Sequence, residues 1–187
     1  MSLWELCQVQ GLTQSHTGSN APHGGSYIFK YVYGNEEVND AYLDKTYKMD
    51  YNIKGITIGR QQSERIIRFN VSKGKLAKFK ALEEFTISCK NIGLKDDMFE
   101  NSTKIKKLDL GTPCDAPFKE YPKHISSLNL NVLVAKGESP ESLGQGFVDL
   151  MNDLINKQHT MVIFNDKQYM APITTDNCLE SVPNGSK

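Results

Sequence analysis

The feature of this sequence that most limits its fold is a series of short segments in which apolar and polar residues alternate. RIIRFNV (65–71) is the clearest, because its alternation places Phe69 on one face and Arg68 on the opposite face. Similar segments, rich in β-branched and aromatic residues, predict further strands at 26–33, 47–60, 85–94, 104–110 and 124–136. The chain is therefore predicted to be β-rich.

One helix is predicted, at 139–157. Ser139 suits the N-cap and Pro140 the first helical position. Two glycines within the segment each weaken a helix by about 1 kcal/mol relative to alanine, so its apolar face must pack against a core. That face is a stripe at helical spacing, made of Leu143, Phe147, Leu150, Met151, Leu154 and Ile155. A closing hairpin is predicted next, with strands at 159–164 and 168–173 joined by a turn at 165–167.

The remaining segments predict connections within one domain spanning residues 1–187. Gly and Ser are frequent at 11–26, which predicts an arm or loop, and the polar segment 174–187 predicts a frayed tail. We expect an acidic turn at 35–44, a short basic helix or a strand connection at 73–84, and a loop at the three prolines of 111–123.

Several strands, one helix and two closing strands follow the element order of an OB-fold barrel. GITIGR (55–60), RIIRFNVSKGKLAKF (65–79) and FTISCKNIGL (85–94) carry this likeness. In these segments the chain resembles an OB-fold subunit of a single-strand DNA-binding or telomere-associated complex. The resemblance implies a β-rich α+β fold, an OB-like barrel with one amphipathic helix before a closing hairpin. It also implies either binding to single-stranded nucleic acid or an adaptor role toward other protein subunits.

Composition excludes several classes of protein. The apolar fraction of 39% and charged fraction of 24% are typical of a globular domain. No apolar run approaches the roughly 20 residues that span a bilayer, so no membrane contact is expected. The first ten residues lack the features of a secretory signal, and we expect an intracellular protein, nuclear or cytoplasmic. The four cysteines are far apart, which argues against a zinc site and a disulfide framework.

The net charge of zero conceals an uneven distribution. Residues 1–53 carry a net charge of −3, residues 54–107 carry +7, and residues 108–187 carry −4. A basic central segment suggests a face that binds a polyanion, although charges separated in sequence also intermix on a folded surface. For nucleic-acid binding, the phosphate contacts would come from Arg60, Arg65, Arg68, Lys73, Lys75, Lys78 and Lys80, and Tyr51 or Phe79 would stack on bases.

An enzyme is the second class of function. His124 and His159 each lie at the start of a β-like segment, near a Ser or Thr, in an incomplete likeness to two-histidine phosphoesterases. Such a chain would be a bacterial or phage effector-type enzyme with a site around these histidines. A Cys89 nucleophile paired with His124 is a further alternative. No motif implies a cofactor or a metal.

The leading hypothesis is a non-enzymatic, OB-like binding or adaptor subunit of a nucleoprotein complex. It would bind protein subunits of that complex and contact single-stranded DNA or RNA through the basic central face. If that face is not contiguous, a pure protein-protein adaptor becomes the better hypothesis.

Overall fold

The computed structural model describes residues 14–17, 26–30, 37–47, 52–110, 118 and 120–169. Its strands are β1 (Gln14–Thr17), β2 (Ser26–Lys30), β3 (Glu37–Asn39), β4 (Ile53–Asn70), β5 (Glu84–Ile92), β6 (Lys107–Asp109), β7 (Val132–Ala135), β8 (Met161–Phe164) and β9 (Lys167–Tyr169). Its helices are α2 (Asp40–Tyr47), α3 (Lys123–Ser126) and α4 (Gln145–Gln158), with 3-10 helices η1 (Lys75–Lys78), η2 (Asp96–Phe99) and η3 (Glu141–Leu143).

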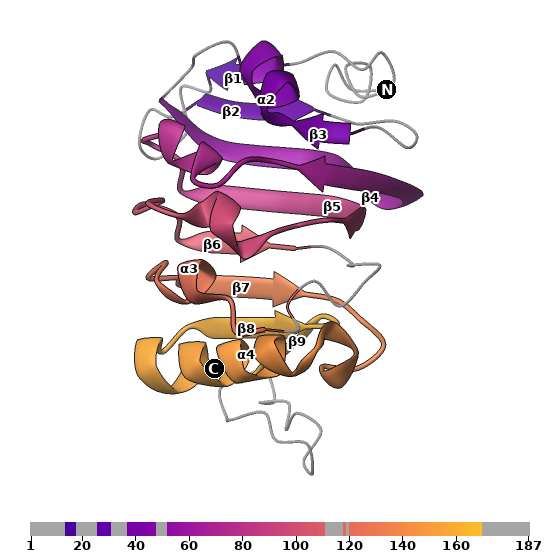
Figure 1. Ribbon diagram of the computed structural model, residues 1–187, viewed down its shortest axis with the longest axis vertical. Helices are drawn as coiled ribbons and strands as arrows, with labels where there is room; N and C mark the ends of the chain where they lie inside the picture. The colour runs from indigo at the N-terminus through magenta and orange to yellow at the C-terminus, as the bar shows by residue number, and fades with distance from the viewer. Residues whose placement is uncertain are drawn as a thin grey trace, which may run out of the picture.

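The nine strands form one open sheet in the order β1-β2-β4-β5-β6-β7-β8-β9, and β3 pairs with β4 beside this path. Among the described strands, all neighbours from β2 to β8 are parallel, and only β1 and β9 pair antiparallel (Figure 1). The β-rich α+β class is thus confirmed, but the described strands do not close into a barrel. Parallel neighbours need a crossover between each pair, which the simple strand order of the prediction did not include.

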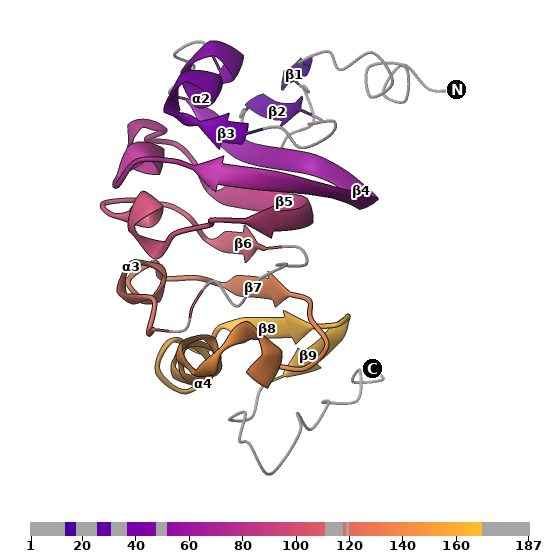
Figure 2. The same ribbon diagram turned by 45° about the vertical axis from the view of Figure 1, so that its right-hand side comes forward.

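The parallel strands are stacked as a repeat. Ile56, Phe85, Leu108, Leu133 and Val162 lie in register on successive strands, at spacings of 29, 23, 25 and 29 residues, and each is at most 1% exposed. Each strand from β4 to β7 is followed by a return segment that carries a 3-10 helix or an α-helix, and these helices lie on one side of the sheet (Figures 1 and 2). This arrangement of strand and return is that of a solenoid, in which each unit contacts chiefly its neighbours.

Strands β4 and β5 turn back near their middles (Figure 2). Their pairing register shifts between Ile58 and Ser63 and again before Ile66. Gly59 lies at this bend with φ of 88°, and a Cβ there would lie 2.5 Å from Sγ of Cys89. The strands predicted at 47–60 and 65–71 are therefore one bent strand, with Phe69 buried and Arg68 exposed as expected.

The apolar stripe predicted for 139–157 is confirmed, because all six of its residues are buried. The helix itself is divided: η3 ends at Leu143, Gly144 adopts φ of 95°, and α4 begins at Gln145. Position 146 has no room for a side chain, because a Cβ there would lie 2.3 Å from the carbonyl carbon of Glu120. Gly144 thus marks the break between η3 and α4, and Gly146 lets α4 approach the backbone of Glu120 closely.

Two segments differ from the prediction because side-chain caps stabilise helices there. Residues 124–136 do not form one strand, since α3 precedes β7, and Asp96 accepts hydrogen bonds from the backbone N–H of His124 and Ile125. The turn predicted at 35–44 contains β3 and the start of α2, where Asn39 Oδ1 accepts from the Tyr42 N–H at 2.8 Å.

The closing hairpin is confirmed: β8 and β9 pair through a turn at Asn165 and Asp166, both with positive φ. The segment 73–84 contains η1, and 11–26 contains β1. Most of the loop predicted at 111–123 and the whole tail predicted at 174–187 lie outside the described residues. No helix in the described part is long and apolar enough to cross a membrane.

Candidate binding surfaces

The face of the sheet opposite the helices carries an apolar patch at its C-terminal end. Along β7 and β8 burial alternates, so that Leu133 and Val162 enter the core while their neighbours point outward. The outward residues pair in register, Val132 with Met161 and Val134 with Ile163, and Met161 is 39% exposed. We call Val132, Val134, Met161 and Ile163 the outer patch.

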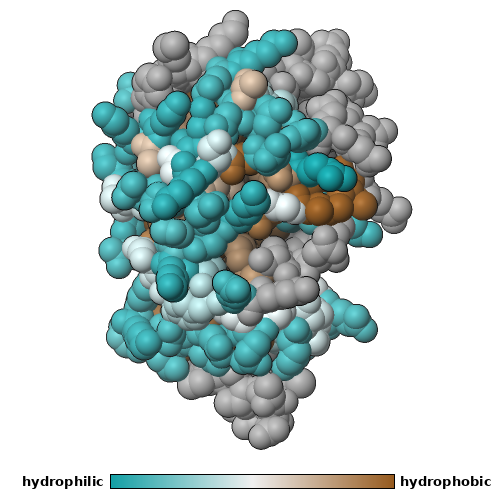
Figure 3. Space-filling model, in the orientation of Figure 1, coloured by the Kyte–Doolittle hydropathy of each residue, from teal (hydrophilic) through white to brown (hydrophobic). Residues whose placement is uncertain are grey.

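Beyond the outer patch the same face becomes polar. Glu84 and Lys107 lie in register with Val132, and Thr86 and Asp109 lie in register with Val134; all four are partly exposed. The sheet therefore presents an apolar surface beside one of mixed charge. The helix-bearing side is mostly hydrophilic, with a hydrophobic area level with β4 and β5 (Figure 3).

The basic central segment is divided by ion pairs. Lys73 Nζ lies 3.2 Å from Oε1 of Glu100, and Lys75 Nζ lies 2.6 Å from Oδ1 of Asp44. Lys75 is buried, whereas Arg68, Lys78 and Lys80 are exposed. Asp44, from the acidic N-terminal segment, thus offsets one charge of the excess counted along the sequence, and Glu100 pairs with Lys73 within the basic segment itself. Both pairs argue against one contiguous basic face.

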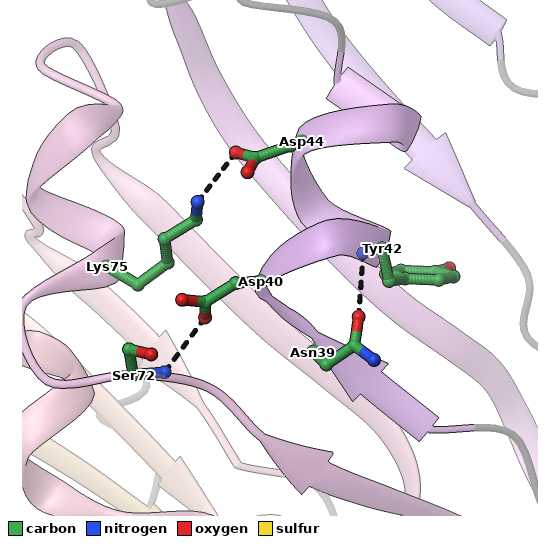
Figure 4. Close-up of polar contacts among 6 residues, drawn as sticks. All are labelled: Asn39, Asp40, Tyr42, Asp44, Ser72 and Lys75. Atoms are coloured by element: carbon green, nitrogen blue, oxygen red, sulfur yellow. Dashed lines mark hydrogen bonds and ion pairs between the residues drawn. The ribbon is translucent and has the colours of Figure 1, made fainter.

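The Lys75 ion pair belongs to a junction that fixes α2 against η1 (Figure 4). Asp40, the first residue of α2, accepts a hydrogen bond from the Ser72 N–H at 2.9 Å. Burial alone would raise the pKa of Asp40, but the hydrogen bonds with Ser72 and the positive charge of Lys75 lower it below its usual value. Burial opposes the charge on Lys75, yet its hydrogen bond to Asp44 raises its pKa. These residues have a structural role.

Phe79, one of the two aromatic residues expected to stack on bases, is not available for stacking. Phe79 is 6% exposed and belongs to the core, so its ring offers no face to a base. Tyr51 and the side chains of Arg60 and Arg65 lie outside what the structure describes.

The two histidines of the enzyme hypothesis lie in different places. His124 lines a cleft of about 590 Å³ with Asp97, Glu120 and Tyr121. His159 does not line this cleft; it is the exposed C-cap residue of α4, with φ of 55°. Within the described part of the chain, no group of three or more His, Cys, Asp or Glu residues could hold a metal ion.

Tyr121 at the wall of this cleft serves the fold. Its hydroxyl donates to Oδ2 of Asp153 at 2.6 Å and shares a hydrogen bond with Ser126. Burial, and then the hydrogen bond to Asp153, raises the pKa of Tyr121. Cys89 is buried in the core. The described geometry therefore brings together neither a histidine pair nor a cysteine-histidine pair in one cleft.

The outer patch was not predicted, although the sequence contains its signal. Apolar residues recur as triplets at positions i, i+3 and i+5, and the triplets are one strand repeat apart. They are Ile53, Ile56 and Ile58, then Leu82, Phe85 and Ile87, then Ile105, Leu108 and Leu110, then Leu130, Leu133 and Ala135, all buried. A search for internal periods of 20–50 residues would have indicated parallel repeats, and hence which residues point outward.

Comparison with known proteins adds no assignment: no family model, curated protein or solved structure matches this chain.

Proposed function

We propose that this chain is a non-catalytic, protein-binding repeat module whose partner docks on the outer patch. The observation that carries the proposal is the register of β7 and β8, which places four outward apolar side chains side by side. Exposed apolar clusters beside polar residues are typical of protein-protein interaction sites. The proposal develops the adaptor hypothesis of the sequence.

The architecture supports this role. Repeats of 23 to 29 residues, each with one strand and a 3-10 or α-helical return, resemble leucine-rich repeats in length and in elements. Stacked repeats create extended surfaces, and such surfaces commonly bind other proteins. The repeat architecture supports a protein-binding role, and the outer patch gives the location of the site.

The charges on the outer face favour a protein over a nucleic acid. Next to the patch lie Glu84, Lys107 and Asp109, a mixed set without an excess of positive charge. An apolar centre with a mixed polar rim is the usual composition of a protein interface. A nucleic-acid surface would carry clustered Lys and Arg for phosphate contacts.

A site-specific photo-crosslinker tests the proposal in cells of the source organism. Placed at Met161, it should give a discrete crosslinked protein, and placed at Asn156, exposed on α4, it should not. Adding the substitutions Val134→Lys and Ile163→Lys should abolish the Met161 crosslink with little change in melting temperature. The same crosslinks from both positions, or a crosslink unaffected by the lysines, would contradict the proposal.

A nucleic-acid role is tested by titrating single-stranded DNA and RNA at low salt, where electrostatic attraction is least screened. Arg68→Glu is the informative variant, because Arg68 is exposed and its substitution should not disturb the core. Salt-dependent binding that this variant weakens would restore the nucleoprotein hypothesis and place the site on the basic segment.

A further inference from the structure

The second halves of β4 and β5 present a face of their own to solvent. Both strands turn back near their middles, so that these halves lie on the helix-bearing side of the sheet, where β4 leads into the segment that carries η1 (Figures 1 and 2). Burial alternates along them: Ile67 and Asn91 point into the core, whereas their neighbours Arg68 and Lys90 are exposed. The outward side chains of the two halves therefore form a surface on the side opposite the outer patch.

The pairing register brings two isoleucines and two cations together on this surface. Ile66 pairs with Lys90, and Arg68 pairs with Ile92. Both isoleucines are partly exposed. Paired residues on neighbouring strands lie about 5 Å apart, and residues i and i+2 on one strand lie about 7 Å apart, so each cation lies next to both isoleucines. We call Ile66, Arg68, Lys90 and Ile92 the limb patch; Figure 3 shows a hydrophobic area level with these strands.

No acid of the described structure forms an ion pair with the cations of the limb patch. Glu37, on β3, lies in register with Arg68, but its Oε1 accepts a hydrogen bond from Nδ2 of Asn70 at 2.9 Å. The ion pairs among the described residues involve other lysines and include neither Arg68 nor Lys90. Both charges are therefore available to a ligand that brings its own carboxylates.

We propose that the limb patch binds an acidic peptide in an extended conformation, with an apolar residue at position i and a carboxylate at position i+2. In such a peptide these two side chains point to the same face about 7 Å apart, which matches the spacing of Ile66 and Arg68 along β4. The apolar residue covers an isoleucine of the patch, and the carboxylate accepts charge-assisted hydrogen bonds from Arg68. Lys90 donates to a second carboxylate of the peptide.

The composition of the limb patch favours a peptide over a nucleic acid. Base stacking needs an aromatic face, and the four residues of the patch are aliphatic or cationic. Two cations also give few phosphate contacts, and phosphate contacts dominate the affinity for nucleic acids. The limb patch shares no residue with the outer patch, so its ligand does not depend on the partner that docks there.

A suitable probe is a fluorescein-labelled peptide of three Leu-Thr-Glu-Thr repeats, titrated with the full chain at low salt and followed by fluorescence anisotropy. When this peptide is extended, its Leu and Glu residues alternate on one face and its Thr residues lie on the other. We expect saturable binding that weakens as salt is added, because salt screens exposed charges. Matched peptides with Lys in place of Glu, or with Ser in place of Leu, should bind at least about tenfold more weakly.

Variants of the chain locate the binding site. Arg68→Gln and Lys90→Gln should each weaken peptide binding about threefold, because each removes one exposed ion pair with the peptide. Lys123→Gln, at an exposed position of α3, is the control and should leave binding unchanged. Ile66→Thr keeps a β-branched residue in the strand and should also weaken binding. A melting curve of each variant shows whether the fold is kept.

The proposal is overturned if the peptide shows no saturable binding at millimolar protein concentration, or if the double variant Arg68→Gln, Lys90→Gln binds it like the wild type. Equal binding of the Lys-substituted peptide would also overturn it, because the charges of the patch would then have no role. Displacement of the peptide by oligothymidylate or by phosphatidylserine vesicles, at a phosphate concentration below that of the peptide carboxylates, would assign the patch to a nucleic acid or a membrane instead.

Discussion

Lys75 and Asp44 form an ion pair with a nitrogen-to-oxygen distance of 2.6 Å, across 31 residues of sequence. The pair is unequal in exposure: the lysine side chain is 4% exposed and the aspartate side chain 60% exposed. The lysine side chain is thus largely withdrawn from water, while its partner stays hydrated. The desolvation of Lys75 is offset chiefly by the hydrogen bond to Asp44, and the charge of Asp40 adds to this.

Asp44→Ala should therefore destabilise the domain more than Lys75→Met. The first variant leaves a buried ammonium without its acid and should cost about 1–2 kcal/mol of unfolding free energy. Lys75→Met removes the buried charge, so no ion-pair partner is needed, and it keeps the hydrocarbon part of the side chain. It should cost under about 1 kcal/mol of unfolding free energy. Urea unfolding of both variants and of the double variant measures the difference. A larger loss for Lys75→Met would show that the charge itself stabilises the junction.

Acid should weaken the domain partly through Asp153. Hydrogen bonds from Tyr121 and Lys157 lower the pKa of this carboxyl below 3.8. A carboxyl with a lowered folded pKa contributes stability above its unfolded value, near 3.9, and that stability is lost as the pH falls through the folded pKa. Asp153→Asn should thus lower the melting temperature at pH 6. Between about pH 4 and pH 2, the melting temperature of this variant should fall less steeply than that of the wild type.

The control for this experiment is Glu141→Gln, at an exposed position of η3. It should leave both the melting temperature and its acid dependence close to those of the wild type. If the melting temperature of Asp153→Asn falls as steeply with acid as that of the wild type, the hydrogen bond from Tyr121 does not lower the pKa of Asp153 in the folded state.

Gly146→Ala should destabilise the domain, although alanine usually stabilises a helix relative to glycine. The added Cβ would lie 2.3 Å from the carbonyl carbon and oxygen of Glu120 and 2.7 Å from the carbonyl oxygen of Phe118. These are backbone atoms, so relief requires moving the segment or the helix, at a cost of about 1–3 kcal/mol. Asn156→Ala, exposed on α4, is the control and should be neutral or slightly stabilising. A stabilised Gly146→Ala would show that the segment can move away.

Local patterns in the sequence predicted the elements whose cause is local. The alternation around Phe69, the stripe from Leu143 to Ile155 and the turn at Asn165 each depend on residues close in sequence, and all three predictions agree with the structure. The pairing of the strands could not be predicted in the same way. Parallel neighbours 23 to 29 residues apart share no turn between them, so the order of elements alone did not reveal them.

The site was harder to predict than the fold, for the same reason. Whether Lys75 offers its charge to a ligand depends on Asp44, which only the folded chain brings within hydrogen-bond distance. Phe79 is aromatic and flanked by lysines, which suggested base stacking, but its ring is taken up by the core. Residue type predicted what these side chains could do, and tertiary contacts decided what was left exposed.

Leu133 and Val134 offer the sharpest test of which face of the sheet is covered. They are adjacent in β7 and point to opposite faces, Leu133 fully buried and Val134 partly exposed. Leu133→Ala should cost about 2–5 kcal/mol, because it removes buried methyl groups and leaves a cavity. Val134→Ala should cost under about 1 kcal/mol, because that side chain keeps contact with water. Chemical denaturation of both variants gives the comparison. A loss of several kcal/mol for Val134→Ala would mean that this face packs against something within the folded chain, and the outer patch would then not be free to dock a partner.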